Sequence, residues 1–243
     1  MKSKIVHLLK DILTWENKSG EIRLILDLPT VTEISFCINA EKVSVKWGDG
    51  QESGRLAQNG WFRHLYEKAG IHHVIIEGEQ IIDVDVRNCY ITSLEVNKCS
   101  TLEYLDCSDN LLRKLDVSGC KRLYELYCNK NQLEELSLKE YDKLFSLSCS
   151  HNYLKNIALE GCRNLVNFNC CRNNLMSLDV SYCRKLSSVN LDWNLLDSKA
   201  LNYFLTSLTS RSKEDVGFIL FRNNAGNYAC DRSILNRKWW NEI

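Results

Sequence analysis

Two residues of types that carry out nucleophilic chemistry, His151 and Cys171, lie 20 positions apart in the middle of the chain. A cysteine becomes a nucleophile when a neighbouring imidazole accepts its proton, and a cation such as Arg172 favours the thiolate. A thiol enzyme also needs an oriented base and an oxyanion hole, and no sequence pattern supplies either. We therefore predict that the chain is not an enzyme, and keep a Cys–His thiol enzyme as an alternative.

The twelve cysteines follow a regular spacing rather than a metal-binding one. Equivalent positions 21 residues apart hold Cys at 107, 128, 149 and 170, and a second series holds Cys at 99, 120, 162 and 183, with Tyr141 in its gap. No C-x-x-C or H-x-x-x-H pair suggests zinc. Stacked identical positions point their side chains the same way, so we expect free thiols that pack as small hydrophobes. No metal and no cofactor is predicted.

The element that positions these residues is a 21-residue repeat. Asparagine recurs at this interval, and each asparagine sits in an L-x-x-L-x-C-x-x-N-x-L frame, which is typical of leucine-rich repeats. Units start near residues 81, 102, 123, 144, 165 and 186, so about six coils are expected over 81–196. The asparagines should form hydrogen bonds with backbone groups of their own and the neighbouring coil. They are Asn110, Asn131, Asn152, Asn173 and Asn194.

The remaining segments lack the repeat. Residues 1–20 have the apolar spacing of an amphipathic helix, and 21–80 show the alternation of short strands and a Gly48-Asp49-Gly50 turn. Residues 197–243 predict a helical C-terminal cap, with Asp197 or Ser198 beginning one helix and Asp231 a second that reaches Trp240. The predicted fold is therefore α+β with a solenoid: a small antiparallel β-sandwich followed by leucine-rich repeats and the cap.

Two resemblances carry further expectations. Val43-x-Val45-x-Trp47-Gly-Asp-Gly, followed by His64-x-Tyr66, resembles the PKD-type immunoglobulin-like fold, which implies that Trp47 and Tyr66 pack the core. The alternation of L-D-V-S-x-C with L-x-C-x-x-N is similar to the repeats of bacterial internalin-like proteins, especially those of Bacteroidetes. So is the ending Gly217-Phe-Ile-Leu-Phe-x-x-Asn224. Such proteins are commonly secreted or attached to the cell surface and are thought to bind proteins or glycans.

The repeat frame also predicts which side chains leave the concave face of the parallel sheet. The first coils are acidic with two tyrosines, and a column at the strand ends mixes charged and aromatic residues. We predict a protein partner, drawn from basic surfaces and held by large aromatic contacts. Glycan binding is the main alternative, and a passive spacer is another. The candidate binding residues are Asp83, Asp85, Tyr104, Asp106, Glu125 and Tyr127 on the strands, and Lys130, His151, Arg172 and Trp193 in the column, which begins at Asp109.

Composition excludes some partners. Lysine plus arginine equals aspartate plus glutamate at 31 each, whereas nucleic acids and anionic membranes attract basic proteins. No stretch approaches the ~20 apolar residues of a membrane span. The first 13 residues do not read as a signal peptide, because His7, Lys10 and Asp11 interrupt the apolar run. The resemblance therefore implies a cell-surface or secreted location, and the cytoplasm is the alternative.

Overall fold

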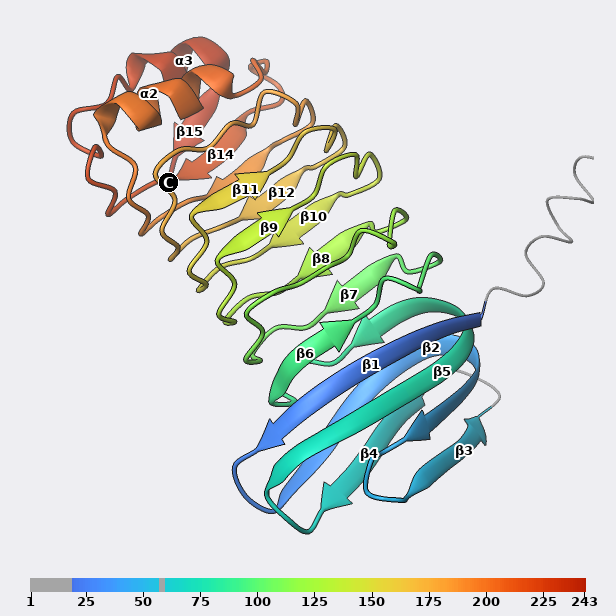
Figure 1. Ribbon diagram of the computed structural model, residues 1–243. Helices are drawn as coiled ribbons and strands as arrows, with labels where there is room; N and C mark the ends of the chain where they lie inside the picture. Colours follow the sequence, from blue (N-terminus) through green and yellow to red (C-terminus); the bar gives the residue numbers. More distant parts are fainter. Residues whose placement is uncertain (1–18, 57–59) are drawn as a thin grey trace, which may run out of the picture.

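The computed structural model describes residues 19–56 and 60–243. A block of long strands comes first and continues into a stack of short coils that ends in two helices (Figure 1). The leucine-rich-repeat solenoid, with its repeat of 21 residues, is therefore confirmed. The amphipathic helix expected over residues 1–20 falls almost wholly outside the described residues.

The long strands are β1 (Ser19–Leu28), β2 (Thr32–Lys46), β3 (Glu52–Leu56), β4 (Gly60–Tyr66), β5 (Gly70–Asp85) and β6 (Ile91–Glu95). The coils carry β7 (Tyr104–Asp106), β8 (Glu125–Tyr127), β9 (Glu135–Ser137), β10 (Ser146–Ser148), β11 (Asn156–Ala158), β12 (Asn167–Asn169) and β13 (Ser188–Asn190). The chain ends with α2 (Ser198–Ser207), β14 (Gly217–Leu220), α3 (Ser233–Lys238) and β15 (Trp240–Glu242).

One strand joins the N-terminal block to the solenoid. β5 pairs antiparallel with β1 and β2, and its last residues, Asp83–Asp85, pair in parallel with β7. The sequence predicts separate strands around Phe36 and Val45, but β2 is continuous and bends through register shifts between Asn39 and Ser44. The boundary at residues 80 and 81 falls inside β5, so the block and the first coil share one hydrogen-bonded sheet. The division into domains and the PKD-type likeness stay predictions.

The Trp-Gly-Asp-Gly turn is held by a buried aromatic cluster. The Tyr66 hydroxyl donates to the Trp47 carbonyl at 2.7 Å, and both side chains are buried. Asp49 accepts from the Gln51 amide at 3.0 Å and lies 2.6 Å from the His64 imidazole, which stacks on Trp47. Burial opposes ionisation of Asp49, but these two hydrogen bonds prevail and lower its pKa. The motif is thus explained by the turn it stabilises.

The asparagine ladder is present as predicted. The Asn152 carbonyl oxygen accepts from the Leu133 amide of the preceding coil at 3.0 Å, and its amide nitrogen donates to three carbonyls, the nearest that of Cys128 at 2.9 Å. The same pattern recurs at Asn110, Asn131, Asn173 and Asn194, all buried. These bonds satisfy backbone groups where the chain turns too sharply for sheet pairing.

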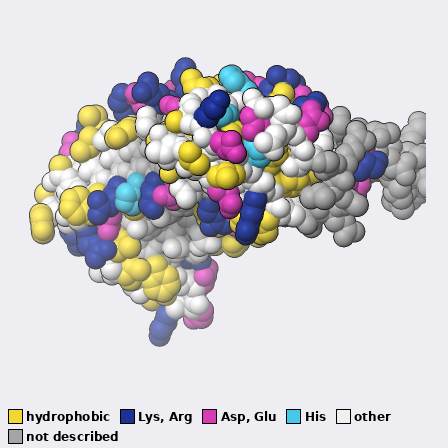
Figure 2. Space-filling view, turned by 90° about the horizontal axis from the view of Figure 1, so that it is seen from below, with side chains coloured by type: hydrophobic (Ala, Val, Ile, Leu, Met, Phe, Trp, Pro, Cys, Tyr) yellow, Lys and Arg dark blue, Asp and Glu magenta, His cyan; other side chains and the backbone are white. Residues whose placement is uncertain are grey.

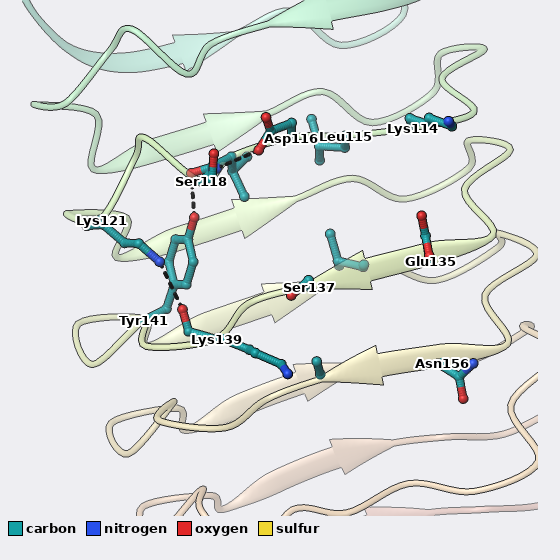
Figure 3. Close-up of a pocket in the computed structure, with 13 residues that line it drawn as sticks. Lys114, Leu115, Asp116, Ser118, Lys121, Glu135, Ser137, Lys139, Tyr141 and Asn156 are labelled. Carbon is teal, nitrogen blue, oxygen red and sulfur yellow. Dashed lines mark hydrogen bonds between the residues drawn. The ribbon is translucent and has the colours of Figure 1, made fainter.

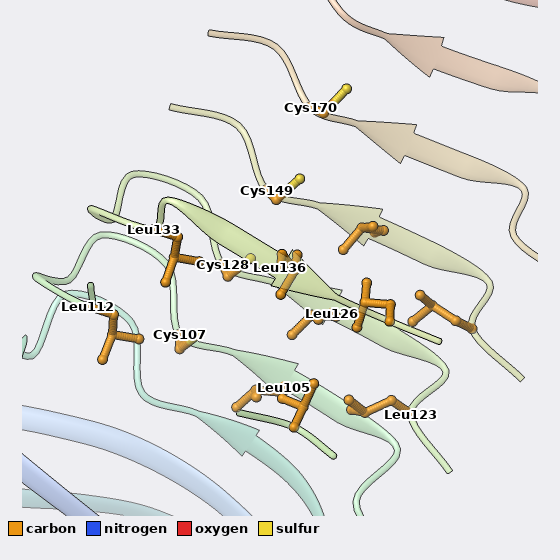
Figure 4. Close-up of a cluster of buried hydrophobic side chains, with 14 of the residues drawn as sticks. Leu105, Cys107, Leu112, Leu123, Leu126, Cys128, Leu133, Leu136, Cys149 and Cys170 are labelled. Atoms are coloured by element: carbon orange, nitrogen blue, oxygen red, sulfur yellow. The ribbon is translucent and has the colours of Figure 1, made fainter. Parts of the chain in front are cut away.

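The cysteine ladders form part of the core. Figure 4 shows Cys107, Cys128, Cys149 and Cys170 at the same place on successive coils, beside a layer of leucines. All twelve cysteines of the chain are free thiols, as expected, and ten of them are buried. Burial raises the pKa of these thiols, to about 12 at Cys120 and Cys162.

The C-terminal segment continues the solenoid before it ends. Asp197 begins α2, accepting from the Ala200 amide at 2.7 Å. Asn224 then repeats the ladder contacts, accepting from the Leu196 amide at 3.1 Å. The expectation that the last helix reaches Trp240 is wrong: α3 ends at Lys238, and Trp240 lies buried in β15, which pairs with β14.

Replacing one ladder asparagine should destabilise the fold. We expect Asn152→Ala to lower the free energy of unfolding by about 1–3 kcal/mol, because the Leu133 amide and buried carbonyls lose their partner. Asn156→Ala, at an exposed position four residues away, is the matched control. Denaturant unfolding measures both, and equal stability of the two variants would refute a structural role for the ladder.

Candidate functional site

The parallel sheet presents two rows of side chains on its outer face, which is the face that the repeat frame predicts to be concave. Each strand places its first and third residues outward and its middle residue in the core, and the pairing register aligns these positions across the coils. One row is Asp83, Tyr104, Glu125, Ser146, Asn167, Ser188 and Phe218. The other is Asp85, Asp106, Tyr127, Ser148, Asn169, Asn190 and Leu220.

Arg87 partly neutralises the acidic end of this face. Its guanidinium forms a two-pronged pair with Asp85, at 2.6 and 2.9 Å, and lies 3.6 Å from Asp106. The first coils, which the repeat frame predicts to be acidic, therefore also carry a cation that is paired with two of their carboxylates. On the surface that Figure 2 shows, charged side chains of both signs are interspersed with hydrophobic ones.

In the part of the chain that the structure describes, the carboxylates of Asp83 and Glu125 accept hydrogen bonds from uncharged donors only. The Asn39 amide donates to Asp83 at 2.7 Å, and the Tyr127 hydroxyl donates to Glu125 at 2.8 Å. The Tyr104 and Tyr127 rings lie 5.7 Å apart between their centroids. Burial raises the pKa of Tyr104 to about 12, with Asp106 and Asp85 adding to the effect. This end of the face thus combines two half-buried aromatic rings with two carboxylates that form no ion pair among residues 19–56 and 60–243.

The serine and asparagine side chains farther along bond to one another. The Asn129 carbonyl oxygen accepts from the Ser148 hydroxyl at 2.6 Å and from the Ser150 amide at 2.9 Å, while its nitrogen donates to Ser108. These groups line a hollow of about 350 Å³ that extends to Lys130 and His151. Because their hydrogen-bonding capacity is used internally, they present little of it to a ligand.

The column at the strand ends has left-handed backbone geometry at every position. Asp109, Lys130, His151, Arg172 and Trp193 have φ between 49° and 58°, a region that costs a non-glycine residue roughly 1–2 kcal/mol. Lys130 pairs with Asp109 at 2.8 Å, and the Arg172 guanidinium lies 5.1 Å from the centre of the Trp193 indole. Trp193 is half exposed. The structure brings the column together as a line beside the two rows.

The structure does not assemble the Cys–His pair. The His151 backbone amide donates to the Cys171 carbonyl at 2.9 Å. Within the described residues, however, no hydrogen bond joins the Cys171 thiol to the His151 imidazole, whose Nδ1 lies 3.3 Å from the Ser150 hydroxyl. Burial raises the pKa of the Cys171 thiol despite contributions from Ser150 and Arg172 that lower it. Burial, together with Arg172 and Lys130, lowers the pKa of His151. A raised thiol pKa is opposite to the activation that a nucleophile needs.

Sequence reasoning missed an extension of the face onto the N-terminal block. β2 pairs with the end of β5 and also with β4, which places Cys37 between Asp85 and Trp61 in one row. Trp61 and Leu65 are exposed, whereas their neighbours Phe62 and Tyr66 are buried. The alternation over 61–66 is visible in the sequence, but the pairing that adds it to the same face as Asp85 is not.

Within residues 19–56 and 60–243 no group of three or more His, Cys, Asp or Glu side chains could hold a metal ion. In the same residues, no helix has the length and apolar character needed to cross a membrane.

Comparisons with known proteins find similar solenoids. No model of a protein family matches the chain, and a search of curated proteins also finds no match. Among solved structures, the functional domain of InlJ from Listeria monocytogenes, which includes a cysteine ladder, is similar with 21% identity and a TM-score of 0.45. That match covers 62% of this chain and 36% of the chain of that functional domain. An internalin (inlF) from Listeria monocytogenes has 17% identity and a TM-score of 0.48, covering 60% of this chain and 42% of that one. The chain thus matches less than half the length of either protein.

Thiol labelling should separate the cysteines by burial. In native protein at mildly alkaline pH, we expect Ellman's reagent to label Cys37 and Cys171, the two partly exposed cysteines, before any other. The ten buried thiols should react only on unfolding, because burial keeps them protonated and inaccessible. Cys171→Ser should remove one rapidly labelled equivalent. Rapid native labelling at Cys149 would contradict the packing.

Proposed function

We propose that the chain is a non-enzymatic recognition module that binds a protein partner on the outer face of its parallel sheet. The observation that carries this proposal is the row Asp83–Tyr104–Glu125, in which an aromatic ring stands between two carboxylates on adjacent strands. A lysine or arginine of the partner would be recognised here.

The chemistry of this row suits a cation. Neighbouring strands lie about 4.8 Å apart, so one basic side chain can contact the Tyr104 ring and a flanking carboxylate together. A cation over an aromatic face contributes about 0.5–2 kcal/mol, more when water is excluded. Arg87 is occupied by Asp85 and Asp106, which leaves Asp83 and Glu125 as the carboxylates available to the partner.

Two features favour a protein over a glycan. The polar half of the face has its hydroxyl and amide groups tied to one another around Asn129, whereas sugar recognition needs such groups free to bond the ligand. Exposed aromatics also flank the face, with Trp61 and Phe218 on strands at its two ends and Trp193 in the column. Large aromatic side chains are typical of the residues that dominate protein interfaces. A cell-surface or secreted location stays a prediction.

Charge-neutralising variants test the proposal. Immobilised full-length chain would be used to select binders from a displayed library of short random peptides, and each binder would be titrated at several salt concentrations. We expect the binders to be rich in Lys and Arg. Glu125→Gln combined with Asp83→Asn should weaken binding by about tenfold or more, since each lost ion pair to a desolvated cation costs at least ~1 kcal/mol.

Asp142→Asn combined with Glu214→Gln is the matched control, because it removes the same two charges at exposed positions outside the sheet. Tyr104→Leu should also weaken binding while leaving salt dependence intact. Binders without basic residues, or equal affinity for the control and the double variant, would refute the cation site. Saturable binding of sugars that is lost in Tyr127→Ala would instead favour glycan recognition.

A further inference from the structure

The wall of the solenoid opposite the long sheet is interrupted between the second and third coils. On one side of the interruption Asp116 bridges to Glu95, and on the other β9 pairs with β11. Among the described residues, no backbone hydrogen bond joins 114–118 to β9. We call this interruption the seam, and Figure 3 shows it from outside.

Tyr141 holds the seam open. At the neighbouring junctions the ladder cysteines Cys120 and Cys162 donate to the carbonyls of Val96 and Leu138, 24 residues earlier, at 3.2 and 3.1 Å. Tyr141 occupies the equivalent position, and its hydroxyl donates to Val117, also 24 residues earlier. A phenol reaches farther than a thiol by the length of its ring. The same hydrogen bond therefore holds these two coils farther apart than their neighbours.

Glycine precedes the ladder cysteine at two junctions where neighbouring coils approach closely, as Gly119 before Cys120 and Gly161 before Cys162. A Cβ at Gly119 would lie 1.8 Å from the Asn97 carbonyl oxygen, and one at Gly161 would lie 2.9 Å from the Cα of Glu140. Side chains at these two positions would force the coils apart, so glycine permits the close approach. At the junction with the seam, Glu140 precedes Tyr141 and occupies the repeat position that is glycine at 119 and 161. The coils are thus pressed together in pairs, with the seam between the pairs.

The seam exposes one edge of β9. The Leu138 backbone amide donates to the Ala158 carbonyl, and the Glu134 carbonyl accepts from the Lys155 amide. Every second residue from Glu134 to Leu138 therefore directs its backbone groups to β11. Backbone groups alternate in direction along a strand, and those of Glu135 and Ser137 therefore face the seam. The wall also lacks strand pairing beyond β11, but there α2 approaches, and the Val180 amide donates to Ser207 at 3.3 Å.

A cavity of about 480 Å³ lies along this edge, within the ~300–1,000 Å³ range of ligand sites. Its apolar surface includes Leu115, Leu136 and the Tyr141 ring. Its rim carries Lys114, Lys121 and Lys139 against the carboxylates of Asp116 and Glu135. Asp116 already accepts from the Ser118 amide, and Lys121 donates to the Lys139 carbonyl (Figure 3). The surroundings favour a ligand that combines an extended backbone, an apolar side chain and negative charge.

We propose that the seam is a second binding site, in which an extended acidic peptide segment of a partner protein adds as a strand to the free edge of β9. Its backbone would bond to Glu135 and Ser137, one apolar side chain would rest on Leu115 and Leu136, and acidic neighbours would face Lys114 and Lys139. Strand addition of this kind takes its affinity from main-chain hydrogen bonds and its specificity from alternate side chains.

The test uses a variant that closes the seam. Tyr141→Cys restores the residue found at the equivalent position of the coils on either side, so the variant should fold with the wall paired. Hydrogen exchange of the Glu135 and Ser137 amides, which face the seam, should be rapid in the native chain and slower in Tyr141→Cys. Unchanged exchange in that segment would overturn the seam itself.

Binding is tested with a displayed library of short random peptides. It is selected on the full-length chain carrying both Glu125→Gln and Asp83→Asn, so that the cation site on the sheet face does not compete. We expect the selected peptides to be acidic with alternating apolar residues. Tyr141→Cys should weaken their binding by about tenfold or more, whereas Tyr141→Phe, which keeps the ring, should still bind them. Lys114→Glu should weaken them, with Lys213→Glu, exposed near the C-terminus, as control. Selection of no such peptide, or equal binding to Tyr141→Cys, would overturn the proposal.

Discussion

The fold depends on the hydrogen bonds of buried asparagine side chains to the backbone of neighbouring coils. In the parallel sheet, β7, β8, β10, β12 and β13 each span only three residues, so sheet pairing satisfies few backbone groups per coil. At the turn after each strand the asparagine amide serves as both donor and acceptor, linking carbonyls of two coils to an amide of the earlier one. An unpaired buried backbone group costs about 1–3 kcal/mol. The ladder therefore fixes both the shape of each turn and the register between coils.

This constraint positions the candidate site. The residue before each ladder asparagine adopts a left-handed conformation, which projects Asp109, Lys130, His151, Arg172 and Trp193 as one column. The register that the ladder maintains also aligns Asp83, Tyr104 and Glu125 across three strands. In the opposite wall, strand pairing between two coils is lost where one side chain departs from the repeat. Tyr141 in place of cysteine separates two coils there without disturbing the sheet, because the asparagine contacts at Asn131 and Asn152 stay intact.

Local spacing in the sequence predicted the solenoid, its asparagine contacts and the burial of the cysteines, since each depends on a repeat of fixed length. Contacts that depend on long-range pairing were not predictable. Asn224 was missed as a ladder member because α2 lengthens its coil. Trp61 was missed on the sheet face because β2 pairs at once with β4 and β5. The pairing of Arg87 with two carboxylates follows from side-chain orientation, which spacing alone does not give.

Amide hydrogen exchange of the unmodified chain, resolved by residue, tests the central role of the ladder most directly. The amides of Leu112, Leu133, Leu154 and Leu175 lie outside every strand, and each donates to a ladder asparagine. The account predicts that they exchange as slowly as amides in the centre of the parallel sheet. Exchange as rapid as that of exposed turn amides would show that the asparagine side chains do not hold the coils together.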